Sequence, residues 1–587
     1  MYFDWKYRLY VLRGAVRLVV LPPVAWYLLV ARPQGIQFTL THGLGAIALD
    51  QGLQWAWESL RTWWAARRLG ARRPPEAQGR WPGNLDIMLK MTFSKGKHTA
   101  WNAKELLESV NSTTVNVRLL GSDLYITTDE RVVKHMLATS FDDFVKGDTQ
   151  TLRLESFLGN GIFNRDGDLW RMHRTMTRPF FARERISDLH RADTHTNKLI
   201  DIIISHCESG PRHGALDIQD LFARLTMDNG SDFLFGQSLG TLDHPRPRAD
   251  NAQIGVKGNA RRCAEFVNAF ESMIFVNEDR AKTMIWMALE FFHDRNAKHV
   301  KIARNYVDGL ITKAISRRGS AETAETERQK VADDETLLDF MIASCEDKTI
   351  IRDELLNVMI AARDTTASTL TFATYLLCRH PEVYRKLRDE VFSICGRDRV
   401  PNLDELRQMR YLRAVINESM RLFPPISFNM RCPAKADSVV QLSDNGEENN
   451  MYIPAGTPVL YIPLLMQRRK DLFGEDADDF DPERWLDPER VARYTKNPFM
   501  WIPFNAGPRI CLGQQFAYNV GTLVLARLAQ RFSKIELAED VQPAASKPPE
   551  AWKQLDGRPA HEKIWPATAL TMFVKGGLWV RFEEDQS

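Results

Sequence analysis

The chain has 587 residues, 44% of them hydrophobic, so it is long enough to bury a large core. Its formal net charge of +3 is close to neutral for this length and gives no sign of a nucleic-acid-binding surface. The seven cysteines are far apart and none forms a C-x-x-C pair. This argues against a disulfide framework or zinc knuckle and favours a reducing compartment.

The first part of the chain predicts a membrane anchor in residues 1–66, followed by a basic and proline-rich linker in residues 67–83. Residues 18–30 carry no charge, and residues 36–57 form a second, less apolar stretch. Tryptophans at the edges and a block of arginines fit a helix or short hairpin in one leaflet or across the bilayer, with the arginines in the cytosol. The alternative is a soluble amphipathic helix pair packed on the next domain.

The remaining residues, 84–587, are predicted to form one large, mainly α-helical body with small β-sheets. From about Asn111 the sequence alternates short β signals, such as TVNVRLLG, with long helical patterns. Residues 160–310 are predicted to be mostly helical. Too few residues follow Cys511 for an added flavin domain.

Two pairs of residues in predicted helices suggest local chemistry. Trp170 and Arg174 are four apart and therefore share one helical face. Asp364 and Thr365 lie within an apolar helical run, where an acid and an alcohol are costly unless they have partners or a role. Otherwise, Thr365 bonds back to its own helix and Asp364 faces solvent.

Cys511 lies in the stretch PFNAGPRICLGQQFAYN, where a glycine-containing loop leads into a predicted helix. The unpaired N–H groups and positive dipole end of such a helix stabilise a thiolate. A thiolate serves as a nucleophile or a metal ligand, and no histidine lies in this segment to act as a base. As a ligand of haem iron, it would need Gly507 and Gly513 to keep side chains away from the flat macrocycle. Arg509 would meet a haem propionate, and Phe504 would shield the sulfur.

The sequence FNAGPRICLG matches all five fixed positions of F-x-x-G-x-R-x-C-x-G, and so it resembles the cysteine loop of the cytochrome P-450 superfamily of haem-thiolate monooxygenases. The resemblance implies the cytochrome P-450 fold and a haem b with Cys511 as its axial ligand, which favours O–O bond cleavage. The haem should be bound non-covalently. Some fatty-acid hydroxylases of the superfamily carry a glutamate that esterifies the haem where this chain has Ala361.

The resemblance extends to distant segments. Glu418 and Arg421, in NESMRLFPP, resemble the family's buried helix motif, and Arg484 of DPERW would complete a structural triad with them. A lone pair at this spacing is more often a surface ion pair. Further contacts with haem propionates are implied for Trp170, Arg174 and Arg431.

The family's A-G-x-D-T pattern corresponds to residues 361–365. In the family, Thr365 would donate a hydrogen bond to dioxygen and Asp364 would relay protons. Ala362 stands where glycine is usual, and we expect its methyl group to lie near the oxygen groove.

Longer stretches, such as GNGIFNRDGDLWRMHRTMTRPFFARER, resemble the fungal branch of the superfamily that oxidises alkanes and fatty acids. Related members oxidise aromatic xenobiotics. The resemblance implies an endoplasmic reticulum monooxygenase with a cytosolic catalytic domain and a lipophilic substrate, which uses O2 and electrons from NADPH–cytochrome P-450 reductase, with cytochrome b5 as a further candidate donor. A group of arginines forms either a solvated face or a docking patch for an acidic electron-transfer partner: Arg171, Arg174, Arg178, Arg183 and Arg185.

Two other functions stay open. The same haem site could rearrange or dehydrate an oxygenated substrate without a reductase, or the chain could be a haem-binding sensor without turnover. Asp364 and Thr365 favour oxygen activation over both. The segment 262–292 is rich in Phe, Met and Trp, which fits an apolar substrate channel or plain core.

Overall fold

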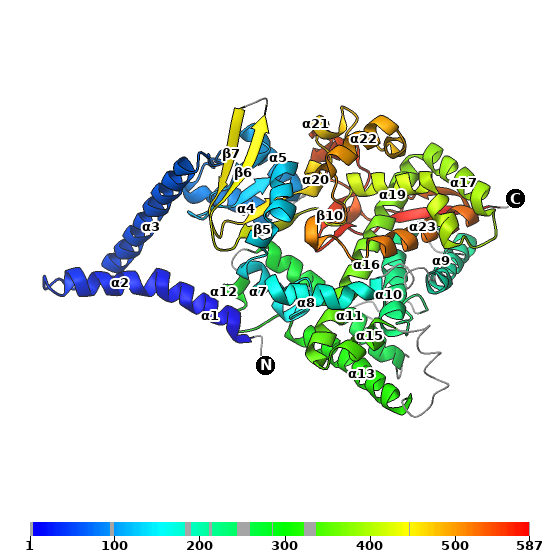
Figure 1. Cartoon of the computed structure of the whole chain (residues 1–587), viewed down its shortest axis with the longest axis horizontal. Coiled ribbons are helices and arrows are strands. Elements are labelled where there is room, and N and C mark those ends of the chain that lie inside the picture. The colour runs from blue at the N-terminus through cyan, green and yellow to red at the C-terminus, as the bar shows by residue number, and fades with distance from the viewer. Residues whose placement is uncertain are drawn as a thin grey trace.

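The computed structural model describes residues 4–93, 99–181, 189–209, 214–243, 259–283, 286–321, 336–444 and 447–585. Figure 1 shows a helix-rich body from which an arm of two long helices projects. The prediction of a mainly α-helical fold with small sheets is confirmed.

The arm consists of two helical stretches. The first runs continuously through α1 (Asp4–Ala15), a π-helical turn (Val16–Val20), α2 (Leu21–Trp26) and a second π-helical turn (Tyr27–Ala31). The second is α3 (Leu40–Arg68), whose start is capped by Thr39, because its hydroxyl accepts a hydrogen bond from the His42 N–H. The first stretch, over Lys6–Ala31, is long and apolar enough to cross a membrane.

The body is built from helices that mostly follow one another directly. Its first half contains α4 (Leu85–Phe93), α5 (Thr99–Ser109), α6 (Glu130–Lys134), α7 (Asp148–Leu158), α8 (Gly167–Thr177), α9 (His190–Ser209), α10 (Ile218–Phe235), α11 (Asn259–Lys282), α12 (Trp286–Leu289) and α13 (Ala297–Ala321). Its second half contains α15 (Leu337–Ser344), α16 (Lys348–Arg379), α17 (Pro381–Cys395), α18 (Leu403–Gln408), α19 (Arg410–Leu422), α20 (Pro463–Met466), α21 (Lys470–Phe473), α22 (Pro488–Lys496) and α23 (Gln514–Arg531).

Within the described residues, four small sheets complete the body. The largest has the strand order β1-β2-β8-β5-β3, and the others are β4-β12-β9, β6-β7 and β10-β11. Within the largest sheet, β2 and β8 are parallel and the other pairs are antiparallel. The strands are β1 (Thr114–Asn116), β2 (Tyr125–Thr127), β3 (Phe144–Val145), β4 (Leu216–Asp217), β5 (Asn429–Pro433), β6 (Ser438–Asp444), β7 (Glu447–Ile453), β8 (Val459–Tyr461), β9 (Phe532–Leu537), β10 (Pro566–Thr568), β11 (Met572–Val574) and β12 (Trp579–Glu584).

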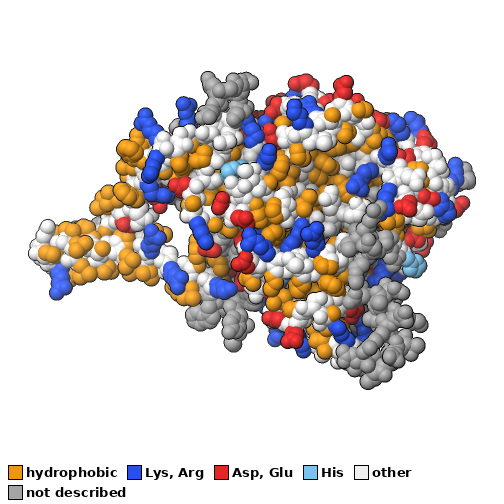
Figure 2. Space-filling view, viewed as in Figure 1, with side chains coloured by type: hydrophobic (Ala, Val, Ile, Leu, Met, Phe, Trp, Pro, Cys, Tyr) orange, Lys and Arg blue, Asp and Glu red, His pale blue; other side chains and the backbone are white. Residues whose placement is uncertain are grey.

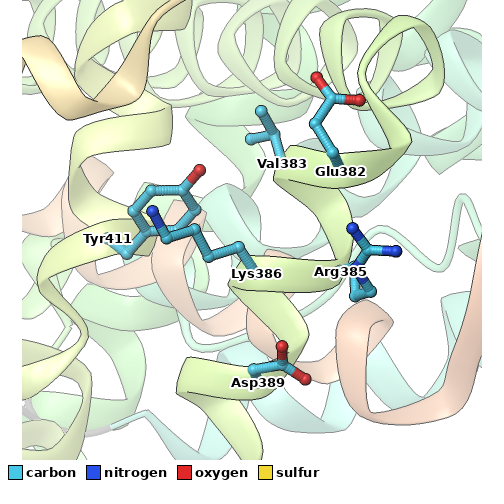
Figure 3. A pocket seen from close by; sticks show the side chains of 6 residues that line it. All are labelled: Glu382, Val383, Arg385, Lys386, Asp389 and Tyr411. Carbon is cyan, nitrogen blue, oxygen red and sulfur yellow. The ribbon is translucent and has the colours of Figure 1, made fainter.

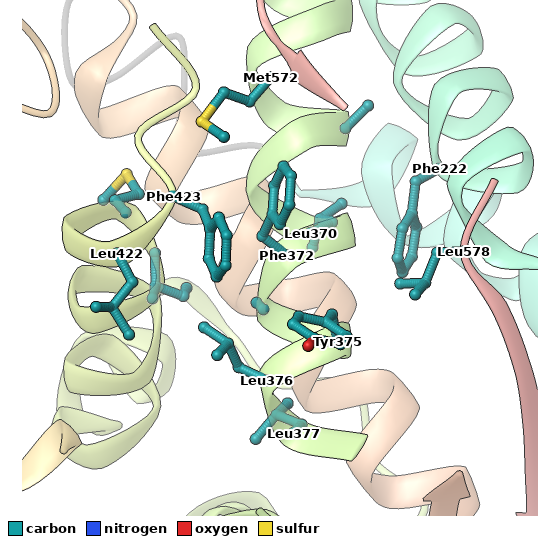
Figure 4. Packing of buried hydrophobic residues seen from close by; sticks show 14 of the residues in the cluster. Phe222, Leu370, Phe372, Tyr375, Leu376, Leu377, Leu422, Phe423, Met572 and Leu578 are labelled. Carbon is teal, nitrogen blue, oxygen red and sulfur yellow. The ribbon is translucent and has the colours of Figure 1, made fainter. Parts of the chain in front are cut away.

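Helix α16 runs through the core. Asp347 caps its start by accepting a hydrogen bond from the Thr349 N–H, and it ends just before Pro381, since a residue that precedes proline disfavours the helical conformation. Phe372 of α16 stacks on Phe423 with ring centroids 4.5 Å apart (Figure 4). Burial of each such side chain contributes roughly 2–3 kcal/mol, so this cluster holds α16 firmly in place.

The stretch between the arm and the body is fixed to the sheets by backbone hydrogen bonds. The Arg72 N–H donates to the Asn450 carbonyl and the Arg72 carbonyl accepts from Tyr452 N–H, both at 2.8 Å. Further along, Asn116 pairs in the same way with Pro75 and Ala77. The residues predicted as a linker therefore add an edge to the sheets.

Candidate haem site

Cys511 lies in the loop before α23, three residues ahead of the helix. All seven cysteines fall within the described residues, and Cys511 is the exposed one. Nevertheless, the protein that surrounds Cys511 raises the pKa of its thiol through burial, against the lowering effects of the Gly513 N–H and the Arg174 charge. A sulfur that is accessible and also surrounded by protein faces an internal space, which is the setting an axial ligand requires.

The glycines of this loop differ in what they do. Gly507 adopts a φ of +67°, and a Cβ added to it would lie 1.7 Å from the Leu137 carbonyl oxygen. It is therefore required by the close approach of two backbones. A Cβ at Gly513 would lie 4.0 Å from the Cys511 Sγ, so this glycine keeps the space beside the sulfur open. Phe504 packs on Tyr518 at 5.0 Å, and its carbonyl accepts a 3.0 Å hydrogen bond from the Cys511 N–H.

Three buried cations gather beside the loop: Lys146, Arg431 and Arg509. Burial lowers the pKa of Lys146 well below its usual value, and repulsion from the two guanidinium groups lowers it further. Among the described residues, the carboxylate that faces these cations is Asp166, which pairs with Arg509 at 2.5 Å. The cluster therefore has an excess of positive charge, as a site for anionic groups needs.

Helix α8 contacts the cysteine loop through both members of its predicted pair. The Arg509 guanidinium lies 4.5 Å from the centre of the buried Trp170 ring. Arg174 donates a 2.6 Å hydrogen bond to the Ile510 carbonyl and is close enough to Cys511 for their charges to interact. Trp170 thus contacts Arg509 of the cationic cluster, and Arg174 contacts the cysteine loop beside the sulfur.

Helix α16 is accessible in its middle, although most of the helix is buried. Ala361, Thr365 and Thr369 are all half-buried, and because they are four residues apart they lie on one face. The Thr365 hydroxyl donates a 2.7 Å hydrogen bond to the Ala361 carbonyl, so it bonds back to its own helix. An accessible stripe within a core helix indicates an internal space along this face.

Asp364 is paired with a neighbouring arginine and does not face open solvent. The Arg363 guanidinium donates to the Asp364 Oδ1 at 2.9 Å and to the Glu271 Oε1, on α11, at 2.5 Å. Burial raises the pKa of Asp364, Arg363 opposes this rise, and the Glu271 charge adds to it. Asp364 is therefore poised to hold a proton at a higher pH than an ordinary aspartate.

The methyl group of Ala362 is directed toward α10. A Cβ added to Gly230 of that helix would lie 3.5 Å from the Ala362 Cβ. The extra methyl relative to the family's usual glycine therefore packs beside a glycine on the neighbouring helix.

Glu418, Arg421 and Arg484 form one buried cluster, and each side chain has no exposed surface. Glu418 accepts hydrogen bonds from Arg421 at 2.7 and 2.8 Å and from Arg484 at 3.3 Å. The Trp485 indole N–H also donates to it, at 3.0 Å. The three residues predicted to form a triad are thus brought together.

A turn between α7 and α8 ties the cationic side of the site to α16. The N–H groups of Asn160, Ile162 and Phe163 donate to side chains of α16 at 3.0 Å each. The Phe163 carbonyl in turn accepts a hydrogen bond from Lys146. The acceptors on α16 are Asp353, Glu354 and Asn357.

Comparisons with known proteins agree with this geometry. The family model described as "Cytochrome P450" matches residues 82–554. The chain belongs to the cytochrome P450 family. Similar curated proteins include cytochrome P450 monooxygenase himC of Aspergillus japonicus, 34% identical over 80% of this chain and 82% of that protein. Cytochrome P450 52A12 of Debaryomyces hansenii is 32% identical, over 81% of this chain and 89% of that protein.

These relatives also agree with the fungal branch that the motifs resemble. A third one, cytochrome P450 52E1 of Candida apicola, is 34% identical over 80% of this chain and 87% of that protein. Several relatives are named monooxygenases, so this P450 is an oxidoreductase of the oxygen-incorporating type. The family implies a haem with a cysteine thiolate ligand, and the accessible sulfur and excess positive charge fit that cofactor.

Sequence reasoning did not identify three residues of the candidate site. Lys146 stands in FVKGD, where no local pattern marks it. Arg363 adjoins Asp364 in the same apolar run, and a second charge there was a visible signal. Glu271 lies in the aromatic segment of α11, and only its position against Arg363 reveals it.

Packing bears on two other predicted features of the P450. In the segment 262–292, Phe266, Phe270 and Met273 are buried in the core, so these three form plain core. In the arginine group, Arg171 pairs with Asp142 and Asp168, whereas Arg183 and Arg185 lie outside the described residues.

A surface pocket of this P450 is lined by residues other than the predicted site residues. It lies between α17 and the start of α19, and Figure 3 shows charged side chains around it. Lys386 lies 4.9 Å from the centre of the Tyr411 ring at its edge. Its lining residues are Glu382, Val383, Arg385, Lys386, Asp389 and Tyr411.

Proposed function

We propose that this P450 is a membrane-anchored monooxygenase that uses haem b to insert one oxygen atom from O2 into a C–H bond of a lipophilic substrate. The observation that carries the proposal is the accessible sulfur of Cys511 within a protein-enclosed site. When bound, haem supplies the chemistry of dioxygen activation, which consumes two electrons and two protons, and an axial thiolate favours O–O cleavage.

The cationic cluster binds and orients the cofactor in this proposal. Lys146, Arg431 and Arg509 would pair with the haem propionates, because charge-assisted hydrogen bonds to carboxylates are the strong ones. Trp170 holds the Arg509 guanidinium in place through its ring. Arg174 holds the cysteine loop through the Ile510 carbonyl.

In this proposal, side chains in the middle of α16 bind and transfer protons. The raised pKa of Asp364 lets its carboxyl hold a proton and pass it on, while Arg363 fixes the carboxyl in position. The Thr365 hydroxyl has an accessible face and a hydrogen bond to its own helix that it can exchange. Together they would deliver protons to reduced dioxygen.

Long-chain alkanes or fatty acids, or aromatic xenobiotics, are the proposed substrates, and the fungal relatives support this class. Electrons would come from NADPH through a cytochrome P450 reductase, with cytochrome b5 as a further donor. The exposed Arg171 and Arg178 would contact these acidic partners. The location would be the endoplasmic reticulum membrane, with the catalytic domain in the cytosol. The apolar helix at Lys6–Ala31 supports the membrane attachment.

The ligand assignment is tested by Cys511→Ser. We expect this variant to lose the reduced carbon monoxide band that marks thiolate ligation. The matched control is Cys345→Ser, a partly accessible cysteine in the turn after α15, which should retain the band. Survival of the band in Cys511→Ser would reject the proposal.

The reaction class is tested with purified reductase, NADPH and a panel of alkanes, fatty acids and polycyclic aromatics. A substrate-induced spectral shift identifies ligands, and product that contains one atom from ¹⁸O-labelled O2 demonstrates monooxygenation. Conversion of an oxygenated substrate without NADPH would instead indicate an isomerase or dehydratase.

A further inference from the structure

Both ends of the helical arm, residues 4–68, return to the catalytic body. At the far end of α3, Ala66 and Ala71 pack against Tyr452 of β7. Directly after the helix, the Arg72 N–H donates to the Asn450 carbonyl at 2.8 Å. This end of the arm is therefore built into the sheet region of the body.

The start of the first arm helix is attached to a different part of the body. Tyr7 is only 6% exposed, its ring lies 5.8 Å from that of Trp286, and its hydroxyl donates to the Glu290 carbonyl at 2.8 Å. The Lys6 Nζ lies 3.1 Å from the Glu155 Oε1 of α7. Figure 1 accordingly shows the start of α1 beside the body and the bend of the arm far from it.

Between these attachments, the arm exposes apolar side chains over most of its length. Leu29 is 77% exposed, Leu40 is 78% exposed and Trp57 is 69% exposed. Figure 2 shows the projecting arm covered largely by hydrophobic side chains. A continuous apolar surface of this extent is costly in water and marks contact with another apolar phase. Since the arm is long, helical and flanked by cations, that phase is a lipid bilayer.

The charges of the arm are sorted by position. Four cations precede Leu18, namely Lys6, Arg8, Arg13 and Arg17. Between Leu18 and Leu60 the sequence contains a single lysine or arginine, Arg32. Five more cations follow this stretch: Arg61, Arg67, Arg68, Arg72 and Arg73. Cations are retained on the cytosolic side of a membrane, so this pattern places both ends of the arm on that side.

The dimensions and the polar residues agree with a hairpin. At about 1.5 Å per residue, the first arm helix is about 40 Å long, against a hydrocarbon core of roughly 30 Å. Helix α3 meets the body again at Trp55, whose ring lies 5.1 Å from the Arg118 guanidinium, and at Ser59, whose hydroxyl accepts a 3.0 Å hydrogen bond from Arg118, so its first half projects. The carboxylate of Asp50, within α3, accepts a 2.7 Å hydrogen bond from Gln54, which reduces the cost of placing it near lipid. Exposed tryptophans at Trp55, Trp57 and Trp64 suit the headgroup level.

We infer that the arm enters and leaves the membrane from the catalytic side, so that the residues ahead of the first helix share a compartment with the catalytic domain. A single-span anchor would place them in the opposite compartment. The inference rests on the proposed membrane attachment and adds the sidedness of the anchor. It also explains why Lys6 and Tyr7 can contact the body, which a chain start on the far side could not do.

The test uses the full-length protein in sealed microsomes, with an epitope tag ahead of Met1 and, in a second version, after Ser587. We expect added protease to remove both tags at the same rate without detergent. An N-terminal tag that is protected until detergent is added would overturn the sidedness. Release of the chain by alkaline carbonate would overturn the membrane attachment and the inference together, so the two failures are distinguishable.

A zero-length carbodiimide cross-link checks the contact itself. We expect an amide between Lys6 and Glu155 in intact membranes, detected as a linked peptide by mass spectrometry. Lys6→Arg is the matched control, because arginine keeps the charge but does not form the product. Lys198 and Asp243, 2.8 Å apart and exposed, serve as the internal positive pair. Formation of their product without the Lys6–Glu155 product would overturn the inference.

Discussion

Two buried arginine clusters of this P450 contrast in their charge balance. In the first, Glu418 accepts hydrogen bonds from both Arg421 and Arg484, and the arginines donate further to backbone carbonyls. In the second, Lys146, Arg431 and Arg509 face a single carboxylate, Asp166, among the described residues. Both clusters are nearly inaccessible to solvent, so burial alone does not separate them.

The difference lies in what each cluster still lacks. Buried charges are tolerated when they are paired and hydrogen-bonded, and the first cluster meets this condition within the chain. The second meets it only when an anion is added. A balanced cluster therefore indicates a structural role, and an unbalanced one indicates a binding site.

Glu418→Ala should have the largest effect, because it removes the carboxylate that pairs with the buried Arg421 and leaves Arg484 with Asp476, 3.0 Å away, as its remaining carboxylate partner. Removal of one partner of a buried pair costs about 3–5 kcal/mol. We expect a large drop in the melting temperature of the apoprotein and poor recovery of folded chain, as measured by circular dichroism. Recovery of a normally stable apoprotein would refute the structural role.

Arg431→Gln should separate binding from folding. Arg431 donates to Asn429 and Met430 on its own strand, so its removal leaves no distant partner unpaired. Loss of one charge-assisted bond of about 1.5–3 kcal/mol predicts haem dissociation that is roughly 10- to 100-fold faster, measured by transfer to apomyoglobin. The apoprotein should melt as the wild type does, and Arg431→Lys should restore part of the haem retention. A destabilised apoprotein with normal haem retention would show that Arg431 has a structural role and does not bind the cofactor.

Lys146→Met should have a smaller effect of the same kind. This change removes a buried ammonium that two guanidinium groups repel, so we expect apoprotein stability within about 1 kcal/mol of the wild type. Haem release should be several-fold faster. Unchanged haem release would exclude Lys146 from the binding cluster.

Glu271→Gln tests a cluster with the opposite balance, in which two carboxylates share Arg363. The Glu271 charge raises the pKa of Asp364, so its removal should lower that pKa. Asp364 then loses its proton at a lower pH, and the fall in product formed per NADPH consumed should begin at a lower pH than in the wild type. A coupling profile identical to that of the wild type would show that Glu271 does not act through Asp364.

The cysteine loop and the Glu418 triad could be predicted because each carries its signal in a short stretch of sequence. Five fixed positions around Cys511 and the two segments NESMRLFPP and DPERW were sufficient. The mainly helical class also followed from periodicity, and the short β signal at TVNVRLLG corresponds to β1. Local patterns thus revealed the parts of the site that are local in sequence.

The remainder depended on contacts between distant segments. Lys146 is a lone lysine in the sequence, and it belongs to the cationic cluster only because the fold brings it close to Arg431, which lies 285 positions further along the chain. The direction of the Ala362 methyl depends on the rotation of α16 against Gly230 of α10, which no sequence pattern specifies. Similarly, the arm ends could be placed only once Tyr7 was seen against Glu290.

The backbone of Phe163 links two parts of the candidate site. Its amide hydrogen is held by Asn357 of α16, and its carbonyl oxygen accepts from Lys146. The backbone of this one residue therefore connects α16 with Lys146 of the cationic cluster, so a change in the packing of α16 on substrate binding would reach that cluster. Occupancy of the substrate space and tightness of cofactor retention would then be mechanically linked, so a well-fitting ligand should slow the escape of the macrocycle.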